Sequence, residues 1–225
     1  MMSGRRAVLG LWILAIALLA GLGAAYIWLR PATGPPAPRS VASPAPSSGT
    51  VGFSRLIGRR APDFALLDQF GHEQRMSRFR GKSVMLTFAD SRCTTVCPLT
   101  ALLLRHTMDL LGPKARDTEV VAVNANARYS SVGDVLRWSR RHDMTHRWLF
   151  LTGPPVGPRS GPLSGLPSVW NAYGIRGGET HTTVVFVIDP SGRIRTAAPI
   201  AGRGSLQAEA SALAKYVSDI ERQTA

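Results

Sequence analysis

The chain has 225 residues and a formal net charge of +13, from 27 lysines and arginines against 14 acidic residues. This length allows one ordinary domain with appendages and excludes two large domains. The basic residues are scattered and form no stripe interleaved with aromatic side chains, so we expect no nucleic-acid partner.

The first predicted element is a membrane anchor. Residues Ala7 to Leu29 form an uncharged run of 23 residues. As a helix this run would be about 34 Å long, enough to cross a hydrocarbon core of about 30 Å. Arg5 and Arg6 precede the run, so we expect residues 1–6 in the cytoplasm. This arrangement predicts a single-pass protein of the bacterial plasma membrane, with its domain on the periplasmic or extracellular side.

A cleaved signal peptide is the alternative for the same segment. The apolar region of a signal peptide is usually about 7–15 residues long, and the longer run found here favours an anchor. Small residues at Gly23, Ala24 and Ala25 leave cleavage open. After the anchor, residues 30–54 are expected to be a linker, because most of this stretch is rich in Pro, Ala and Ser. Residues 55–225 are then expected to form the folded domain.

The folded domain is predicted to alternate strands with helices. Residues 63–67 and 73–76 flank a turn at 68–71 and predict a hairpin, and the apolar run 83–89 predicts a buried central strand. Residues 98–111 predict a helix that begins at Pro98 and exits at Gly112. The apolar face of that helix is expected to comprise Leu99, Leu102, Leu103, His106 and Leu110.

The second half continues the same alternation. Strands are predicted at 119–124, 148–151, 182–188 and 192–196, and helices at 132–142, 164–173 and 205–220. The turn between the last two strands is Asp189 to Gly192, with proline second and glycine fourth. Strands separated by helices predict an α/β fold whose sheet is largely parallel, covered on both faces, and antiparallel at one edge.

The chemistry is expected at Cys93 and Cys97, which are the two cysteines of the chain. They lie between a predicted buried strand and a helix N-terminus, where sites collect in open α/β sheets. The helix start and the neighbouring Arg92 both favour a thiolate. A structural disulfide closing so short a loop would contribute little to stability. A redox pair and a site for a soft metal ion, Cu(I) or Zn, remain equally compatible with the spacing.

A third metal ligand would distinguish these interpretations. His72 is expected to be solvated, His106 to be a core or surface residue, and His142 and His146 to be exposed. His181 differs because it follows a glycine-rich loop and begins a predicted strand. In a thioredoxin-like sheet this position comes close to the dithiol, although isolated histidines are usually structural.

The chain resembles the redoxin superfamily in Ala61-Pro62-Asp63-Phe64 and in Phe79-Arg80-Gly81-Lys82. The motif Cys93-x-x-x-Cys97-Pro98, with Leu151-Thr152-Gly153 and with His181 before Asp189-Pro190-Ser191-Gly192, resembles the SCO/SenC family. The resemblance covers about residues 55–222. It implies a thioredoxin-like fold with a central mixed sheet flanked by helices. It also implies a monomeric copper protein of cytochrome c oxidase assembly, in which Cys93, Cys97 and His181 are the ligands of Cu(I).

Departures from the family pattern indicate a divergent SCO-like member. Thr94 and Thr95 stand where the family usually has Pro and Asp, and residues 122–126 replace its usual Ser-Val-Asp-Pro segment. The chain also lacks the peroxiredoxin motif Pro-x-x-x-Thr-x-x-Cys. The cis-proline of thioredoxin-type oxidoreductases is missing as well, and His181 stands roughly at its place.

The resemblance therefore implies a metallochaperone that passes Cu(I) to a membrane copper enzyme such as cytochrome c oxidase subunit II. Two alternatives stay open. One is a thiol–disulfide oxidoreductase that reduces client cysteines through Cys93 and Cys97. The other is a sensor of copper or redox state.

Overall fold

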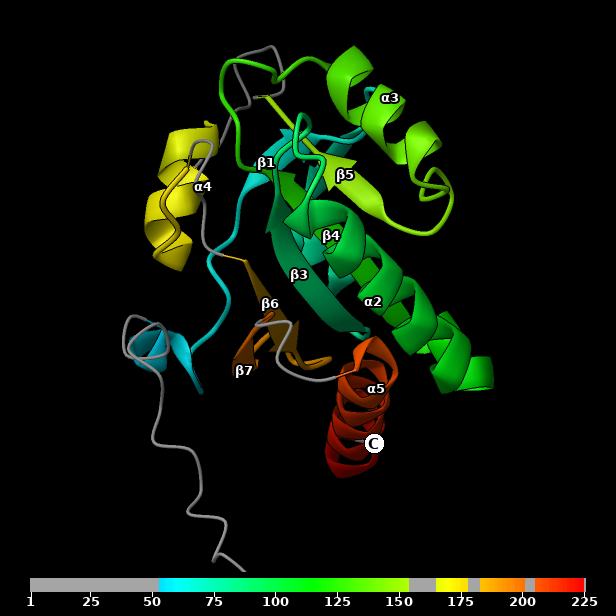
Figure 1. Ribbon diagram of the computed structural model, residues 1–225. Coiled ribbons are helices and arrows are strands. Elements are labelled where there is room, and N and C mark those ends of the chain that lie inside the picture. The colour runs from blue at the N-terminus through cyan, green and yellow to red at the C-terminus, as the bar shows by residue number, and fades with distance from the viewer. Residues whose placement is uncertain (1–52, 154–164, 178–182, 201–204, 225) are drawn as a thin grey trace, which may run out of the picture. The chain divides into compact units, whose positions relative to one another are not determined.

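The computed structural model describes residues 53–153, 165–177, 183–200 and 205–224 (Figure 1). The predicted anchor and nearly all of the predicted linker lie outside the described residues. None of the helices in the described part is long and apolar enough to cross a membrane. The described helices are α2 (Val96–Leu111), α3 (Val132–Arg141), α4 (Leu166–Tyr173) and α5 (Leu206–Thr224). The strands are β1 (Ala65–Leu67), β2 (Glu73–Arg75), β3 (Ser83–Ala89), β4 (Thr118–Asn124), β5 (Leu149–Leu151), β6 (Val184–Ile188) and β7 (Ile194–Pro199).

The main sheet has five strands in the order β5-β4-β3-β6-β7. Strands β3, β4 and β5 are parallel, whereas β6 is antiparallel to both of its neighbours. The predicted mixed sheet is therefore confirmed. The reversed strand lies one position inside the edge, because the turn at Asp189 to Gly192 sends β7 back along β6.

Strand β3 is buried at every position, because helices cover both faces of this sheet. Successive side chains of a strand point to opposite faces. Val84, Leu86 and Phe88 accordingly join a core cluster that includes α4, while Met85 and Ala89 join a second cluster formed with α2, α3 and α5 (Figure 1). The chain thus has the thioredoxin-like α/β architecture, with the central strand ending directly before the cysteine motif.

The start and the buried face of α2 differ from the prediction. The helix begins at Val96, and Pro98 is its third residue. Proline is tolerated there because the first four N–H groups of a helix have no partner within the helix. Leu103 of the predicted apolar face is buried, but Leu99 and Leu110 are 54% and 47% exposed, so the prediction is wrong at those two positions. The buried side carries Cys97, Thr100, Ala101, Leu103, Leu104, Thr107 and Leu111.

The predicted hairpin is confirmed as β1 and β2, and it borders the outer strand of the main sheet. Leu67 and Thr152, which follows β5, exchange backbone hydrogen bonds of 3.0 and 2.7 Å. The Gln69 side chain accepts a hydrogen bond of 2.8 Å from the Phe150 N–H and donates one of 2.9 Å to the Trp148 carbonyl. The hairpin turn therefore pairs with backbone groups that would otherwise be open at this edge.

Candidate functional site

The two cysteines lie where β3 gives way to α2. Cys93 stands three residues before the helix and is half-buried, whereas Cys97 is the second helical residue and is 1% exposed. Neither cysteine forms a disulfide bond in this structure. The backbone N–H of Cys97 donates a hydrogen bond of 3.4 Å to Cys93 Sγ. The first turn of the helix therefore presents a donor to the outer sulfur.

Cys93 is the more acidic of the two thiols. Its partial burial would by itself raise its pKa. Hydrogen bonds from the backbone and side chain of Cys97 and of Thr95 outweigh that effect, so the pKa of Cys93 lies below the ordinary value. Thr95 Oγ1 lies 3.7 Å from the Cys93 sulfur. The reachable sulfur is consequently the one that more readily becomes a thiolate, which is the nucleophilic form.

Cys97 has the opposite character. Burial strongly raises the pKa of its thiol, and the hydrogen bond with the Cys93 side chain and the charges of Cys93 and Asp90 raise it further. A hydrogen bond with the Asp90 backbone offsets only part of this. Cys97 therefore stays protonated while Cys93 ionises. The pair consists of one nucleophilic thiol, Cys93, and one resolving thiol, Cys97.

Asp90 holds the loop that precedes Cys93. This aspartate is buried, and its backbone carbonyl accepts a hydrogen bond of 3.0 Å from the Cys93 N–H. Its carboxylate accepts a bond of 2.7 Å from the Arg92 N–H and bonds of 3.0 and 3.1 Å from the Asn126 side-chain amide. The loop is thus tied to the segment that follows β4.

Asn124 strengthens the same connection. Its side-chain oxygen accepts bonds from the N–H groups of Ser91 and Asn126, at 3.4 and 3.1 Å. Its amide donates 2.8 Å to the Tyr129 carbonyl, which also receives the Ser91 hydroxyl at 2.7 Å. Sequence reasoning noted this segment only as a departure from the SCO/SenC pattern. The signal for its role was a pair of asparagines at the carboxyl end of the strand next to the cysteine strand, one as its last residue and one just beyond it.

Trp138 fixes the cysteine loop from the side of α3. Its indole N–H donates a hydrogen bond of 3.0 Å to the Cys93 carbonyl. The ring is held by Trp148 and His142, at centroid distances of 5.3 and 4.1 Å. A capping box of Ser131 and Asp134 starts the helix. Cys93 therefore belongs to a loop held on two sides.

The predicted copper ligands are brought together only in part. His181 lies outside the described residues, so the set of Cys93, Cys97 and His181 stays a prediction. Within the described ranges, no group of three His, Cys, Asp or Glu side chains could hold a metal ion.

The other histidines do not contribute to the dithiol. His72 is exposed in the hairpin turn, and His146 is exposed and stacks on Phe70. His106 is half-buried in α2. His142 was expected to be exposed and is instead half-buried, because it packs against Trp138.

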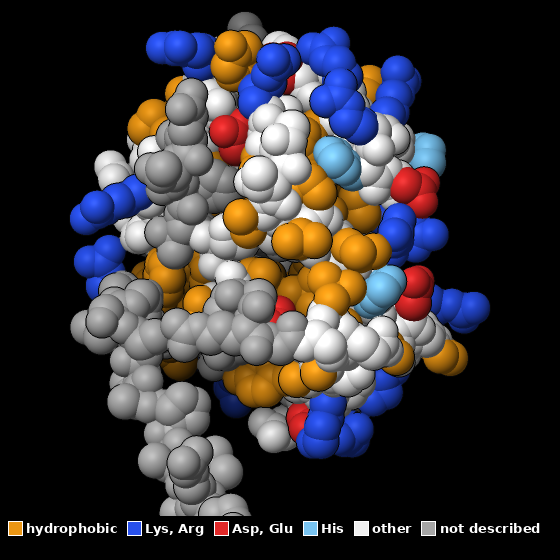
Figure 2. All heavy atoms as spheres, viewed as in Figure 1, with side chains coloured by type: hydrophobic (Ala, Val, Ile, Leu, Met, Phe, Trp, Pro, Cys, Tyr) orange, Lys and Arg blue, Asp and Glu red, His pale blue; other side chains and the backbone are white. Residues whose placement is uncertain are grey.

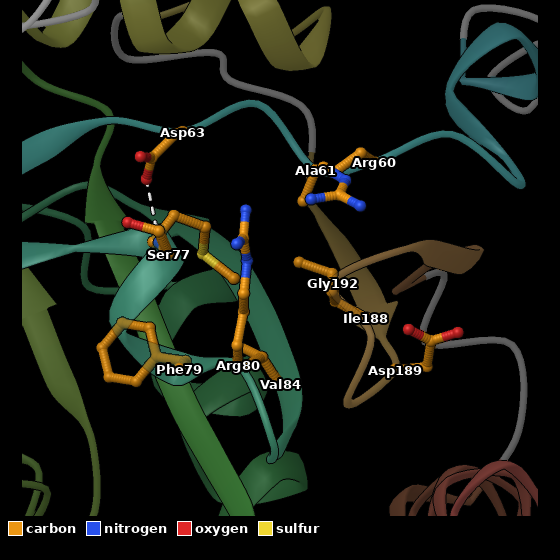
Figure 3. A pocket seen from close by; sticks show the side chains of 11 residues that line it. Arg60, Ala61, Asp63, Ser77, Phe79, Arg80, Val84, Ile188, Asp189 and Gly192 are labelled. Carbon is orange, nitrogen blue, oxygen red and sulfur yellow. Dashed lines mark hydrogen bonds between the residues drawn. The ribbon is translucent and has the colours of Figure 1, made fainter. Parts of the chain in front are cut away.

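A hollow at the opposite end of β3 is too small for a substrate. Figure 3 shows Arg60, Arg80 and Asp63 among its lining side chains, and the Asp63 carboxylate accepts a hydrogen bond of 2.8 Å from the Ser77 N–H. Its volume is about 20 Å³, room for about one water molecule. Val84 lines it, and the remainder of β3 extends for about 17 Å before the cysteine loop. The chemistry is therefore expected at the dithiol.

Comparison with known proteins gives a matching family and a related oxidoreductase. The AhpC/TSA family matches residues 57–197. The thiol-disulfide oxidoreductase ResA of Geobacillus kaustophilus (strain HTA426) is 31% identical over 139 residues, which are 62% of this chain and 67% of that protein.

Solved structures share the thioredoxin-like fold at low identity. Bradyrhizobium japonicum ScoI with copper bound is 17% identical with a TM-score of 0.55, over 70% of this chain and 99% of that one. The thioredoxin domain of a Bacteroides vulgatus thiol-disulfide oxidoreductase is 20% identical with a TM-score of 0.52, over 72% and 97% of the two chains. Similarity at this level shows a shared fold alone.

Proposed function

The chain belongs to the AhpC/TSA family of thioredoxin-like proteins, and on that premise we propose that it is a thiol–disulfide oxidoreductase working through Cys93 and Cys97. The observation that supports this proposal is the difference between the two thiols. Cys93 is reachable and has a lowered pKa, whereas Cys97 is buried and has a raised pKa. The AhpC/TSA family is the one that matches the chain. The SCO/SenC family, which the cysteine motif resembles, is a finer assignment.

The proposed reaction is a two-step exchange. The Cys93 thiolate attacks a client disulfide, so that a bond forms between Cys93 Sγ and one client sulfur while the client S–S bond breaks. The departing client thiolate takes up a proton. Cys97 then loses its proton and attacks Cys93 Sγ, which releases the second client thiol. The client disulfide is reduced, the protein dithiol is oxidised to a disulfide, and a dithiol electron donor is required to restore it.

Peroxide reduction, another thiol chemistry, receives less support from the site. The residue three positions before Cys93 is Asp90, where the peroxiredoxin motif has threonine. Asp90 is a buried carboxylate, and its oxygens already accept hydrogen bonds from Arg92 and Asn126. It therefore adds negative charge near the thiolate instead of a hydroxyl donor for a peroxide oxygen.

The pH dependence of a single turnover tests the proposed function. The reduced protein is mixed with a neutral aromatic disulfide, and the released thiol is followed by absorbance. Because only the thiolate attacks, the rate should be low in acid, rise as Cys93 deprotonates, and level off below the ordinary pKa of a thiol. Cys93→Ala is the control and should remove the reaction. A rate that keeps rising past the ordinary thiol pKa, or a reaction that persists in Cys93→Ala, would contradict the proposal.

Copper delivery is the second candidate. It is supported by the approach of both cysteines at one helix start, where the Cys97 N–H lies 3.4 Å from Cys93 Sγ, and by the copper-bound ScoI structure of the same fold. In this proposal Cys93, Cys97 and His181 hold Cu(I) as cargo for an enzyme such as cytochrome c oxidase subunit II. The metal would have to displace the Cys97 proton, so copper affinity should fall as the pH falls.

His181→Ala separates the two candidates. Loss of even an outer-shell partner of a metal ligand typically costs 10–100-fold in affinity, so loss of a direct ligand should weaken Cu(I) retention by about tenfold or more against a competing chelator. Disulfide exchange should remain within about twofold, because it needs no imidazole. The matched control is His146→Ala, which removes an exposed histidine and should alter neither property. Unchanged copper retention in His181→Ala would remove His181 from the ligand set.

Both candidates are proposed to act outside the cytoplasm. Arg5 and Arg6, followed by the uncharged run to Leu29, support a single-pass anchor with its N-terminus inside. A tether of this kind would keep the dithiol close to membrane-bound clients.

A further inference from the structure

A second hollow lies directly beside Cys93. Its volume is about 150 Å³, enough for an acidic side chain. The cysteine loop forms one wall and α3 forms the other. The lining residues are Ser91, Arg92, Thr94, Asp134, Arg137, Trp138 and Arg141.

The lining of this hollow is basic. Three guanidinium groups stand against one carboxylate. Asp134 pairs with Arg137 at 2.9 Å, while Arg92 lies over the Tyr129 ring at 4.6 Å. Among the described residues, no carboxylate forms an ion pair with Arg92 or Arg141. Figure 2 shows Lys and Arg side chains gathered at the top of the view, the end of the molecule where α3 lies. The net charge of the lining therefore favours an anion.

The hollow adjoins the loop that carries the reacting sulfur. Arg92 and Thr94 are the chain neighbours of Cys93, and Trp138 donates its hydrogen bond to the Cys93 carbonyl from the hollow's wall. A group bound there is consequently held next to the site of attack. A guanidinium accepts a carboxylate in a bidentate geometry, which fixes orientation as well as charge.

We infer that this hollow receives an acidic side chain of the client polypeptide, adjacent to the client cysteine that Cys93 attacks. The inference rests on the proposed exchange and names its substrate class. The arginines would offset the repulsion between an acidic client and the Cys93 thiolate. The preferred client is therefore a peptide with Glu or Asp beside its reacting cysteine.

Two matched peptides test the inference. They carry the same disulfide to a neutral leaving thiol and differ only in Glu or Gln beside the cysteine. The reduced protein should react with the Glu peptide about fivefold faster at low salt, the size expected for one partly exposed ion pair. Because salt screens exposed charges, the preference should shrink toward one in about 0.5 M salt.

Adjacent arginines of α3 provide the matched variants. Arg141→Gln removes a charge that lines the hollow and should reduce the preference to about twofold or less. Arg140→Gln removes the same charge one residue earlier, from a side chain that lines a different hollow with Phe70 and Asp143. It should keep the wild-type preference. If both variants lower the preference equally, the effect is one of net charge, and the hollow is not the recognition site.

A neutral small disulfide, run in parallel, separates failure of this inference from failure of the proposed function. If it reacts normally while both peptides react at equal rates, recognition of an acidic client is overturned and the exchange stands. If it does not react, the proposed function is overturned, and the inference that depends on it is overturned as well. Glutathione disulfide provides the last comparison. An Arg141-dependent preference for it over its carboxamide analogue, equal to that for the Glu peptide, would assign the hollow to small acidic thiols and overturn the peptide client.

Discussion

Cys97→Ser is expected to trap a covalent complex between the protein and its client through Cys93. In this variant Cys93 still attacks the client disulfide, but no second thiol is present to release the product. Net release of reduced client should fall by on the order of 10³-fold or more, as is common for loss of one member of a covalent catalytic set. Mass spectrometry under non-reducing conditions should show the mass of the chain plus one client peptide.

Cys93→Ser is the matched variant and should form no adduct. Its remaining thiol is buried and has a raised pKa, so it offers little thiolate to a client. An adduct on Cys97 in this variant would mean that the roles of the two cysteines are reversed. Several turnovers by Cys97→Ser would mean that Cys97 is not needed to release the product.

Phe186→Ala is expected to cause the largest loss of stability among single substitutions in the described core. Phe186 is fully buried in β6, and its ring lies 5.2 Å from Phe53, 6.2 Å from Phe88 and 5.5 Å from Tyr173. Truncation would remove all three ring contacts and leave a cavity. We expect about 3–5 kcal/mol of destabilisation, a large part of a typical stability of about 5–15 kcal/mol.

Thermal or urea unfolding, followed by circular dichroism, measures this loss. The melting temperature should fall by about 10–15 °C for a domain of this size. Phe70→Ala is the control, because Phe70 is 45% exposed in the hairpin turn and should cost about 1 kcal/mol or less. Equal shifts in the two variants would mean that Phe186 is not a central element of the core.

The fold could be predicted from sequence where local pattern and tertiary packing agree. The strand at Ser83–Ala89 was predicted with its observed bounds, because a short apolar run suits a strand buried on both faces. The helix after it was harder to predict. Leucines surround much of α2, so periodicity did not distinguish the side that packs on the sheet from the exposed side with Leu99. Proline likewise indicates the first turn of a helix more reliably than its first residue.

The site could be predicted only where its residues are neighbours in the chain. Cys93 and Cys97 were identified as the site because they lie between a strand and a helix. Their opposite pKa shifts depend on burial and on hydrogen bonds that spacing does not reveal. The basic hollow joins Arg92 to Arg141, which come from segments far apart in the sequence. The anchor, its orientation and His181 as a ligand stay predictions.

The hairpin turn that borders β5 affects the tendency of the domain to aggregate at high protein concentration. An open strand edge is a template for pairing with another molecule, and thus a starting point for aggregation. Here β5 is only three residues long, its neighbour Thr152 is bonded to Leu67, and Gln69 occupies backbone groups of Phe150 and Trp148. At high protein concentration, the backbone groups at this edge of the sheet are therefore already hydrogen-bonded within the chain. We expect this edge not to form intermolecular β-structure with another copy of the domain.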